Sequence, residues 1–277
     1  MPPKLFLGVS ALVPKVMCYE YILFTYHTLD RGIWFLRECR DVIKEVIIDT
    51  GVFKFFEKLG LKDYPVWFLS RYVRALLKVR NLFSHEFHIY YVIPDIPVDY
   101  EGRASLYPWN VKRTIEYIKY FLRWYVNELK PLEPIAPVQG GPKPDATPAK
   151  VFRKHYEIYS KFYYLALAPT CSTKLLHRLA DMIETFDKEV DRPYHAFGVH
   201  VRVFDILKLR KIIWFRSFDT SSYSNPKYLT NLKLPPKYKN AVRALDLIRK
   251  CREKGIEVGK YEVRDDKVLQ YLKQLKT

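Results

Sequence analysis

Four polar residues stand just after, or near the end of, four short apolar runs. They are Asp49 in IIDTG, Asp95 in VIPD, Gln139 in PVQGG and Asp219 in FRSFD. The apolar runs predict buried parallel strands, and the carboxyl ends of parallel strands in a barrel meet at one mouth. The pattern therefore predicts that three carboxylates and one amide converge, although they lie up to 170 positions apart in the chain. Each aspartate taken alone is explained equally well as a turn former or a helix cap.

This set of side chains suits chemistry at the anomeric carbon of a sugar. Breaking a glycosidic bond passes through an oxocarbenium-like state, which one carboxylate can trap covalently while a second group moves protons. Hydrolysis or exchange at a glycosidic bond is the reaction class that the pattern favours.

The elements that must position these residues alternate between strands and helices. Near-continuous apolar runs predict strands at 5–9, 46–48, 89–93, 135–138, 162–168, 195–199 and 212–215. Segments with helical period predict helices at 33–46, 66–79, 108–129, 149–160, 172–187 and 204–209. A strand followed by a helix, repeated about seven times, indicates an α/β protein. Periodicity alone leaves both a (β/α)8 barrel and a doubly wound sheet open.

The composition indicates a folded and strongly basic protein. The chain has 277 residues, 49% of them hydrophobic, with 47 Lys and Arg against 30 Asp and Glu, a net charge of +17. Such a surplus attracts polyanions, so nucleic acid is the first partner to consider, and the glycoside is then a nucleoside within DNA or RNA. An acidic membrane surface could use the same charge. No apolar run approaches the roughly 18 residues of a membrane span, which argues against an integral membrane protein.

The pattern divides the chain into a main domain and an appendage. Residues 1–232 carry the alternating pattern and are predicted to form the barrel. Residues 233–277 hold 13 Lys and Arg against 6 Asp and Glu, a net charge of +7, and are predicted to form a basic extension, helical around 238–254. The segment GGPKPDATPA at 140–149 predicts a loop, either a connector or a lid over a site.

Four cysteines, at positions 18, 39, 171 and 251, are spread along the chain without a CxxC pair. This spacing indicates neither a disulfide framework nor a thiolate zinc site, and we expect a reducing compartment. Pro14 and Lys15 interrupt the first apolar run before any cleavage pattern, so no signal peptide is predicted. The expected location is the cytoplasm, which for a viral chain would be that of the host.

Six short motifs occur in a fixed order over about 175 residues. They are IIDTGVF at 47–53, PDIP at 94–97, VQGG at 138–141, LALAP at 165–169, HAFGV at 195–199 and SFDTSSY at 217–223. In order and spacing they resemble the guanine transglycosylases, which exchange guanine for a 7-deazaguanine in tRNA or, in the DNA-modifying branch, in DNA. The PD and SFDTSSY elements look more like the DNA-directed branch. The resemblance implies a TIM-like (β/α)8 barrel and a base-exchanging glycosyltransferase that acts on a pentose.

The resemblance also implies a role in the reaction for two aspartates. Asp219 would be the nucleophile that attacks C1′ and displaces guanine, which leaves a covalent link between enzyme and nucleic acid. Asp49 would be the acid or base that moves protons on the leaving and incoming bases.

Further residues are implied to bind the base, through side chains or the main chain: Asp95, Gln139, Gly140, Ala166, Leu167 and His195. Asp95 would accept hydrogen bonds from N1–H and the exocyclic amine, the donor pair that distinguishes guanine from adenine. Gln139 would donate to the base carbonyl, with main-chain N–H groups of the LALAP motif assisting. His195 would touch substrate or orient Asp219, and a buried, satisfied histidine explains it equally well.

Three departures from the family pattern bear on the substrate. The tRNA enzymes hold zinc with three Cys and one His near the C-terminus, whereas Cys251 stands alone here, so neither zinc nor another cofactor is expected. LALA replaces their paired glycines, and 277 residues leave no room for the extra RNA-binding domains of the archaeal enzymes. Each departure weakens the tRNA assignment more than the DNA assignment.

We therefore expect DNA as the macromolecular substrate, tRNA as the alternative, and a 7-deazaguanine base as the second substrate; a homo- or hetero-oligomer stays open. A second class is a nucleic-acid-binding barrel without catalysis, which would have no reason to keep both reacting carboxylates, Asp49 and Asp219. A third class is an unrelated glycoside hydrolase, with two carboxylates about 5 to 9.5 Å apart and no need for a basic surface.

Overall fold

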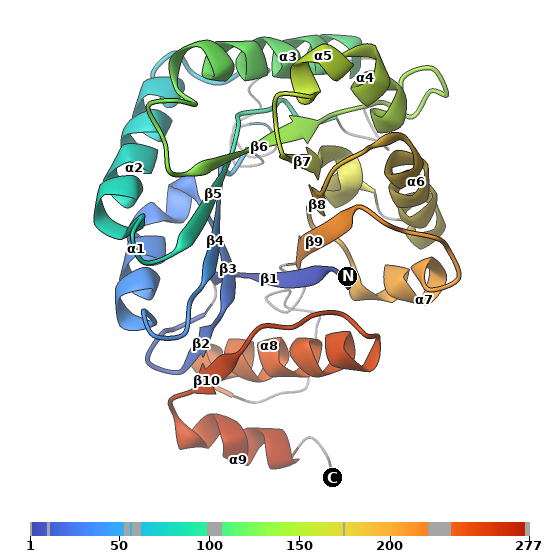
Figure 1. Cartoon of the computed structure of the whole chain (residues 1–277). Helices are drawn as coiled ribbons and strands as arrows, with labels where there is room; N and C mark the ends of the chain where they lie inside the picture. The colour runs from blue at the N-terminus through green and yellow to red at the C-terminus, as the bar shows by residue number, and fades with distance from the viewer. Residues whose placement is uncertain are drawn as a thin grey trace.

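The computed structural model describes residues 2–9, 12–52, 56, 62–98, 107–173, 175–220 and 234–274. Within these residues, eight parallel strands close into a barrel in the order β1-β3-β4-β5-β6-β7-β8-β9, and helices surround it (Figure 1). The ring is closed because β1 pairs with β9, with Lys4 opposite Ser217 and Leu7 opposite Thr220. The predicted α/β barrel is therefore confirmed, and the doubly wound sheet is ruled out.

The barrel strands are short and mostly buried. They are β1 (Lys4–Gly8), β3 (Tyr21–Thr25), β4 (Glu45–Asp49), β5 (His88–Val92), β6 (Glu133–Val138), β7 (Tyr164–Leu167), β8 (Tyr194–Ala196) and β9 (Phe215–Thr220). The helices among and after them are α1 (Leu29–Glu38), α2 (Phe68–Phe83), α3 (Tyr107–Trp124), α4 (Pro148–Lys154), α5 (Tyr156–Tyr159), α6 (Leu176–Glu189), α7 (Phe204–Leu207), α8 (Pro236–Glu253) and α9 (Asp266–Gln274). Shorter 3-10 turns are η2 (Tyr26–Thr28), η5 (Ala168–Ser172) and η6 (Val201–Val203), and two further strands, β2 (Met17–Tyr19) and β10 (Tyr261–Val263), pair with each other. No helix in the described part of the chain is both long and apolar enough to cross a membrane.

Side chains fill the interior of the barrel, as contacts between strands that are not neighbours show. The Lys4 ammonium on β1 forms an ion pair with Glu45 on β4. The rings of Phe6 on β1 and His195 on β8 lie 6.0 Å apart, centre to centre. Such contacts can only cross the inside of the ring, so the barrel is a packed core with its open site at one end.

The outer helices cover the strands with one apolar face each. Along α2 the buried positions include Phe68, Tyr72, Leu76 and Val79, spaced three or four residues apart. The Tyr72 hydroxyl reaches through this face and contacts the carbonyl oxygens of two barrel strands, at Ile48 (3.2 Å) and Val92 (2.8 Å). Burial of this face fixes α2 against β4 and β5, the two strands that lead to predicted site residues.

One barrel strand, β3, was not among the predicted strands. The apolar character runs almost without interruption from Val16 to Phe24, across β2 and β3, with only Glu20 between the two strands. Glu20 is buried, and its carboxylate accepts a hydrogen bond from the Lys260 main-chain N–H and pairs with Lys44. A single polar residue that is satisfied inside the fold leaves no turn signal in the sequence, so the boundary could not be seen there.

The C-terminal residues lie against the outside of the barrel, next to β1 and β2 (Figure 1). Helix α8 buries Tyr238, Val242, Leu245 and Ile248 among other residues. Strand β10 pairs antiparallel with β2, and the Leu5 N–H on β1 donates to the Glu257 carbonyl (3.0 Å). The division of the chain after residue 232 stays a prediction, because residues 221–233 lie outside the described part.

The expectation that the cysteines form no disulfide is wrong. Cys18 on β2 and Cys39, at the C-terminal end of α1, are disulfide-bonded, with Cα atoms 5.6 Å apart. They lie 21 positions apart in the chain, and only the tertiary fold brings them together. The expected reducing compartment rested on the cysteine spacing and loses that support.

Candidate active site

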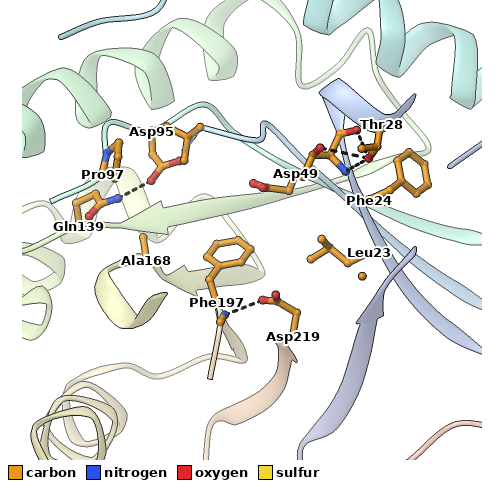
Figure 2. Close-up of a pocket in the computed structure, with 14 residues that line it drawn as sticks. Leu23, Phe24, Thr28, Asp49, Asp95, Pro97, Gln139, Ala168, Phe197 and Asp219 are labelled. Carbon is orange, nitrogen blue, oxygen red and sulfur yellow. Dashed lines mark hydrogen bonds between the residues drawn. The ribbon is translucent and has the colours of Figure 1, made fainter. Parts of the chain in front are cut away.

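The strand ends bring all four predicted polar residues to one pocket. Asp49 is the last residue of β4, Asp95 follows β5, Gln139 follows β6 directly, and Asp219 lies near the end of β9. They line a cavity of about 230 Å³ at the carboxyl end of the barrel (Figure 2). The rest of the wall is largely apolar and includes Leu23, Phe24, Val52, Pro97, Ala168 and Phe197.

Asp95 and Gln139 form a hydrogen-bonded pair on one wall of the pocket. The Gln139 carbonyl oxygen accepts from the Val98 main-chain N–H (3.2 Å), and its Nε2 donates to Asp95 Oδ2. Because an N–H and a carboxylate are its neighbours, the amide has only one workable orientation, with the NH2 group beside Asp95. The pair therefore presents an amide donor next to a carboxylate acceptor.

Burial strongly affects the Asp95 carboxyl group. Burial raises the pKa of Asp95 to about 7, with a further upward contribution from the charge of Asp49, while the Gln139 hydrogen bond acts in the opposite direction. The hydroxyl of Tyr64 donates to the Asp95 carbonyl (3.0 Å), which fixes the backbone at this point. The carboxyl group is thus held in place and close to its protonation midpoint at neutral pH.

Asp49 lies in a tight turn at the end of β4, the strand that pairs with β5. The Gly51 N–H donates to Asp49 Oδ2 at 3.1 Å, and Gly51 has φ of +71°, a conformation that favours glycine. A Cβ at Gly51 would also lie 2.7 Å from the His27 ring. The pKa of Asp49 is raised to about 6. Burial is the main cause and the charge of Asp219 adds to it, while the hydrogen bond from the Gly51 N–H lowers the pKa. Asp49 is therefore suited to exchange a proton near neutrality.

Asp219 is oriented by two donors on one of its oxygens. Oδ1 accepts from the Gly198 main-chain N–H (3.0 Å) and lies 3.1 Å from His195 Nε2. Figure 2 shows Asp219 beside Phe197 in the pocket. Oδ2 makes no hydrogen bond to the described residues. One oxygen is thus anchored, and the other is left for a reacting group.

The remaining base-binding predictions lie outside the pocket lining. Ala166 and Leu167 are fully buried in β7, paired with β6 and β8, and the wall is formed by the next residue, Ala168. Gly140 packs instead against Pro148, whose N atom would lie 2.3 Å from a Cβ at this position. His195 is fully buried behind Asp219, which fits the orienting role and not substrate contact. The last residues of the SFDTSSY motif, from 221, lie outside the described part of the chain.

Sequence reasoning missed four residues of the site: three from β3 and the turn after it, and Gly198, which precedes β9 in the chain. Leu23, Thr25 and Thr28 line the pocket, and Gly198 supplies the N–H that anchors Asp219. The segment Tyr21–Thr25 does end an apolar run in a polar residue, the same pattern that marked the other four sites. Gly198 has φ of +62° and gave no separate signal beyond its place in HAFGV.

Within the described residues, no three His, Cys, Asp or Glu side chains are grouped so that they could hold a metal ion. No known protein-family model matches the chain, and no curated protein shows significant sequence similarity to it.

Proposed function

We propose that this protein is a transglycosylase that replaces guanine in nucleic acid, preferably DNA, with a 7-deazaguanine, through a covalent aspartyl intermediate. The observation that carries the proposal is one pocket that combines two kinds of polar groups. Gln139 and Asp95 form a pair that presents an amide donor beside a carboxylate, and two more carboxylates, Asp49 and Asp219, line the same pocket.

The Asp95 and Gln139 pair is complementary to the Watson–Crick edge of guanine. That edge offers two adjacent donors, N1–H and the exocyclic amine, beside one carbonyl acceptor. Asp95 would accept from the donors, and the second N–H of the Gln139 amide would donate to the carbonyl. A 7-deazaguanine keeps the same edge, because it differs only at position 7 of the five-membered ring. Adenine reverses the polarity of this edge and would leave buried polar groups unpaired.

The two carboxylates can divide the reaction between them. Asp219 Oδ2 attacks C1′, the bond between C1′ and N9 breaks, and its electron pair leaves with guanine, which takes a proton from Asp49. The incoming 7-deazaguanine then gives its N9 proton to Asp49 and attacks C1′ through N9. The ester bond to Asp219 breaks, and the carboxylate is restored.

Charge supports a nucleic acid as the substrate. The net charge of +17 favours a polyanion, and a base in a duplex must leave the stack to reach a pocket of this kind. The sequence resemblance to the DNA-directed branch favours DNA in particular.

The test is base exchange with DNA and, separately, tRNA that carry radiolabelled guanine, each incubated with 7-deazaguanine bases. Wild type is compared with Asp219→Asn and with the control Asp30→Asn, which removes a 97% exposed carboxylate on α1. We expect label release from DNA, loss of release in Asp219→Asn by more than about 10³-fold, and unchanged release in the control. Omission of the incoming base should let a covalent adduct with the oligonucleotide accumulate, visible on a denaturing gel.

Release of labelled guanine from tRNA alone would support the same reaction with tRNA, and not DNA, as the substrate. No release from either, together with tight and salt-sensitive binding to one of them, would refute the enzyme and favour a nucleic-acid-binding barrel without catalysis.

A further inference from the structure

Three buried polar side chains form a hydrogen-bonded chain inside the barrel, directly behind Asp219. His195 and Ser217 are fully buried, and Tyr164 is 5% exposed. Ser217 Oγ contacts both the Tyr164 hydroxyl (2.5 Å) and His195 Nδ1 (2.7 Å). His195 Nε2 lies 3.1 Å from Asp219 Oδ1. The chain links β7, β8 and β9 and ends on a carboxylate that lines the pocket.

The chemistry of these groups gives the chain one direction when the imidazole is neutral. An ionised Asp219 only accepts hydrogen bonds, so its contact with His195 is a hydrogen bond only in the tautomer with the proton on Nε2. Nδ1 is then an acceptor, which requires Ser217 to donate to it. The Ser217 oxygen in turn accepts from the Tyr164 hydroxyl. Every donor in the chain therefore points toward Asp219.

We propose that Tyr164 and Ser217 are positioning residues that act through His195: they hold its Nε2–H tautomer, which fixes Asp219 Oδ1 and leaves Oδ2 directed into the pocket. This inference rests on the proposed function for its catalytic consequence, but the tautomer itself is a property of the free protein. Oδ1 is contacted by His195 Nε2 from the core side and by the N–H of Gly198, which lines the pocket. A carboxylate without these two donors could rotate and present either oxygen at the wrong angle to C1′.

A purely structural role does not explain why these polar groups are buried, because their burial is costly. Three polar groups in the centre of a barrel contribute to stability only when all are satisfied, and apolar residues of similar size would fill the same space. The adjoining interior positions are indeed aromatic, since Phe6 lies 6.0 Å from the His195 ring and Tyr90 lies 5.1 Å from the Tyr164 ring. The polar chain leads from β7 to Asp219, and the Lys4–Glu45 ion pair is a separate polar contact inside the ring.

The first experiment measures the tautomer directly. Two-bond nitrogen–proton correlation spectra of histidine-labelled protein distinguish Nε2–H from Nδ1–H, and His195→Asn identifies the His195 signals. At about pH 8 we expect the Nε2–H form in the wild type. Ser217→Ala, which removes the donor to Nδ1, should introduce the Nδ1–H form, and Tyr164→Phe should give a smaller change in the same direction.

The second experiment measures base exchange in the same variants. We expect Ser217→Ala to lower kcat on the order of 100-fold with KM for nucleic acid unchanged, and Tyr164→Phe to give a smaller loss of kcat. The control is Tyr91→Phe, which removes another buried hydroxyl from the barrel, one without a hydrogen-bond partner in the described part of the chain. It should change neither the tautomer nor kcat.

An Nδ1–H or doubly protonated His195 in the wild type would overturn the inference, as would a folded Ser217→Ala protein with the tautomer and kcat of wild type. If the wild type exchanges no base but Ser217→Ala still shifts the tautomer, the proposed function fails and the positioning chain stands.

Discussion

Replacement of Asp95 by asparagine should make the protein more stable at alkaline pH and remove a large part of its pH dependence. Asparagine has nearly the same size, its carbonyl oxygen can accept the hydrogen bond from Gln139, and it cannot ionise. Asp95 is 6% exposed, and burial raises its pKa to about 7 from the ordinary value of 3.8. The wild type must therefore ionise a buried carboxyl group as the pH rises, and the variant need not.

The sign and size of the effect follow from proton linkage. Between pH 3.8 and about 7 the folded state binds the proton of Asp95 more tightly than the unfolded state does. The stability from this group is therefore fully present below the unfolded pKa and is lost as the pH rises through the folded pKa. At about 1.4 kcal/mol per pKa unit, the loss between about pH 5 and about pH 8 is about 2 to 3 kcal/mol.

Thermal or urea unfolding of both proteins at several pH values measures this difference. The wild type should lose about 2 to 3 kcal/mol more than Asp95→Asn across the interval, or roughly 5 to 10 °C in Tm. The control Asp145→Asn removes an exposed carboxylate and so makes the same change in net charge. It should follow the wild-type curve. If Asp95→Asn keeps the wild-type pH dependence to within about 0.5 kcal/mol, the carboxyl group is not the buried, proton-binding group that we describe.

Two further predictions concern stability. Reduction of the disulfide between Cys18 and Cys39, or its removal in the double alanine variant, should lower the free energy of unfolding by about 3 kcal/mol, because the bond closes a loop with a sequence separation of 21 residues. Thermal unfolding with and without reductant measures this loss. An unchanged Tm would contradict the bond. Gly140→Ala should cost about 1 to 3 kcal/mol, because its Cβ would lie 2.3 Å from the backbone N of Pro148. Gly8→Ala, whose Cβ meets nothing within 4 Å, is the matched control, and equal Tm losses in the two variants would refute the packing argument.

The sequence predicted most of the barrel and four of the polar residues that line the pocket for one reason. A strand that is buried on both faces reads as a continuous apolar run, so a polar residue such as Asp49 or Gln139 at the end of a run marks the end of a strand. No strand was predicted at β3, because β2 precedes it without a turn residue, although its apolar run ends in a polar residue like the other four. Where the turn signal was missing, the strand and its pocket residue Thr25 were missed as well.

Main-chain contributions to the pocket were harder to predict than side-chain contributions. A position such as Ala166 or Ala168 has the same apolar character whether its backbone is paired inside the barrel or faces the cavity. The structure assigns Ala168 to the wall and Ala166 to the strand ladder, a difference of two residues. That difference depends on where β7 ends, which is set by pairing with β6 and β8 and not by the local sequence.

The amino-acid sequence by itself determined the alternation of strands and helices, the strong positive charge, and which polar residues stand at strand ends. These are properties of neighbours in the chain, and local patterns carry them. Only the tertiary structure decided that the ring closes, that Cys18 meets Cys39, and that a buried chain behind Asp219 anchors one of its oxygens. The raised pKa values of Asp95 and Asp49 were also decided by the tertiary structure alone. Burial, hydrogen-bond direction and the electric field at a carboxyl group depend on atoms that are distant in sequence, and those atoms acquire fixed positions only when the whole barrel has formed.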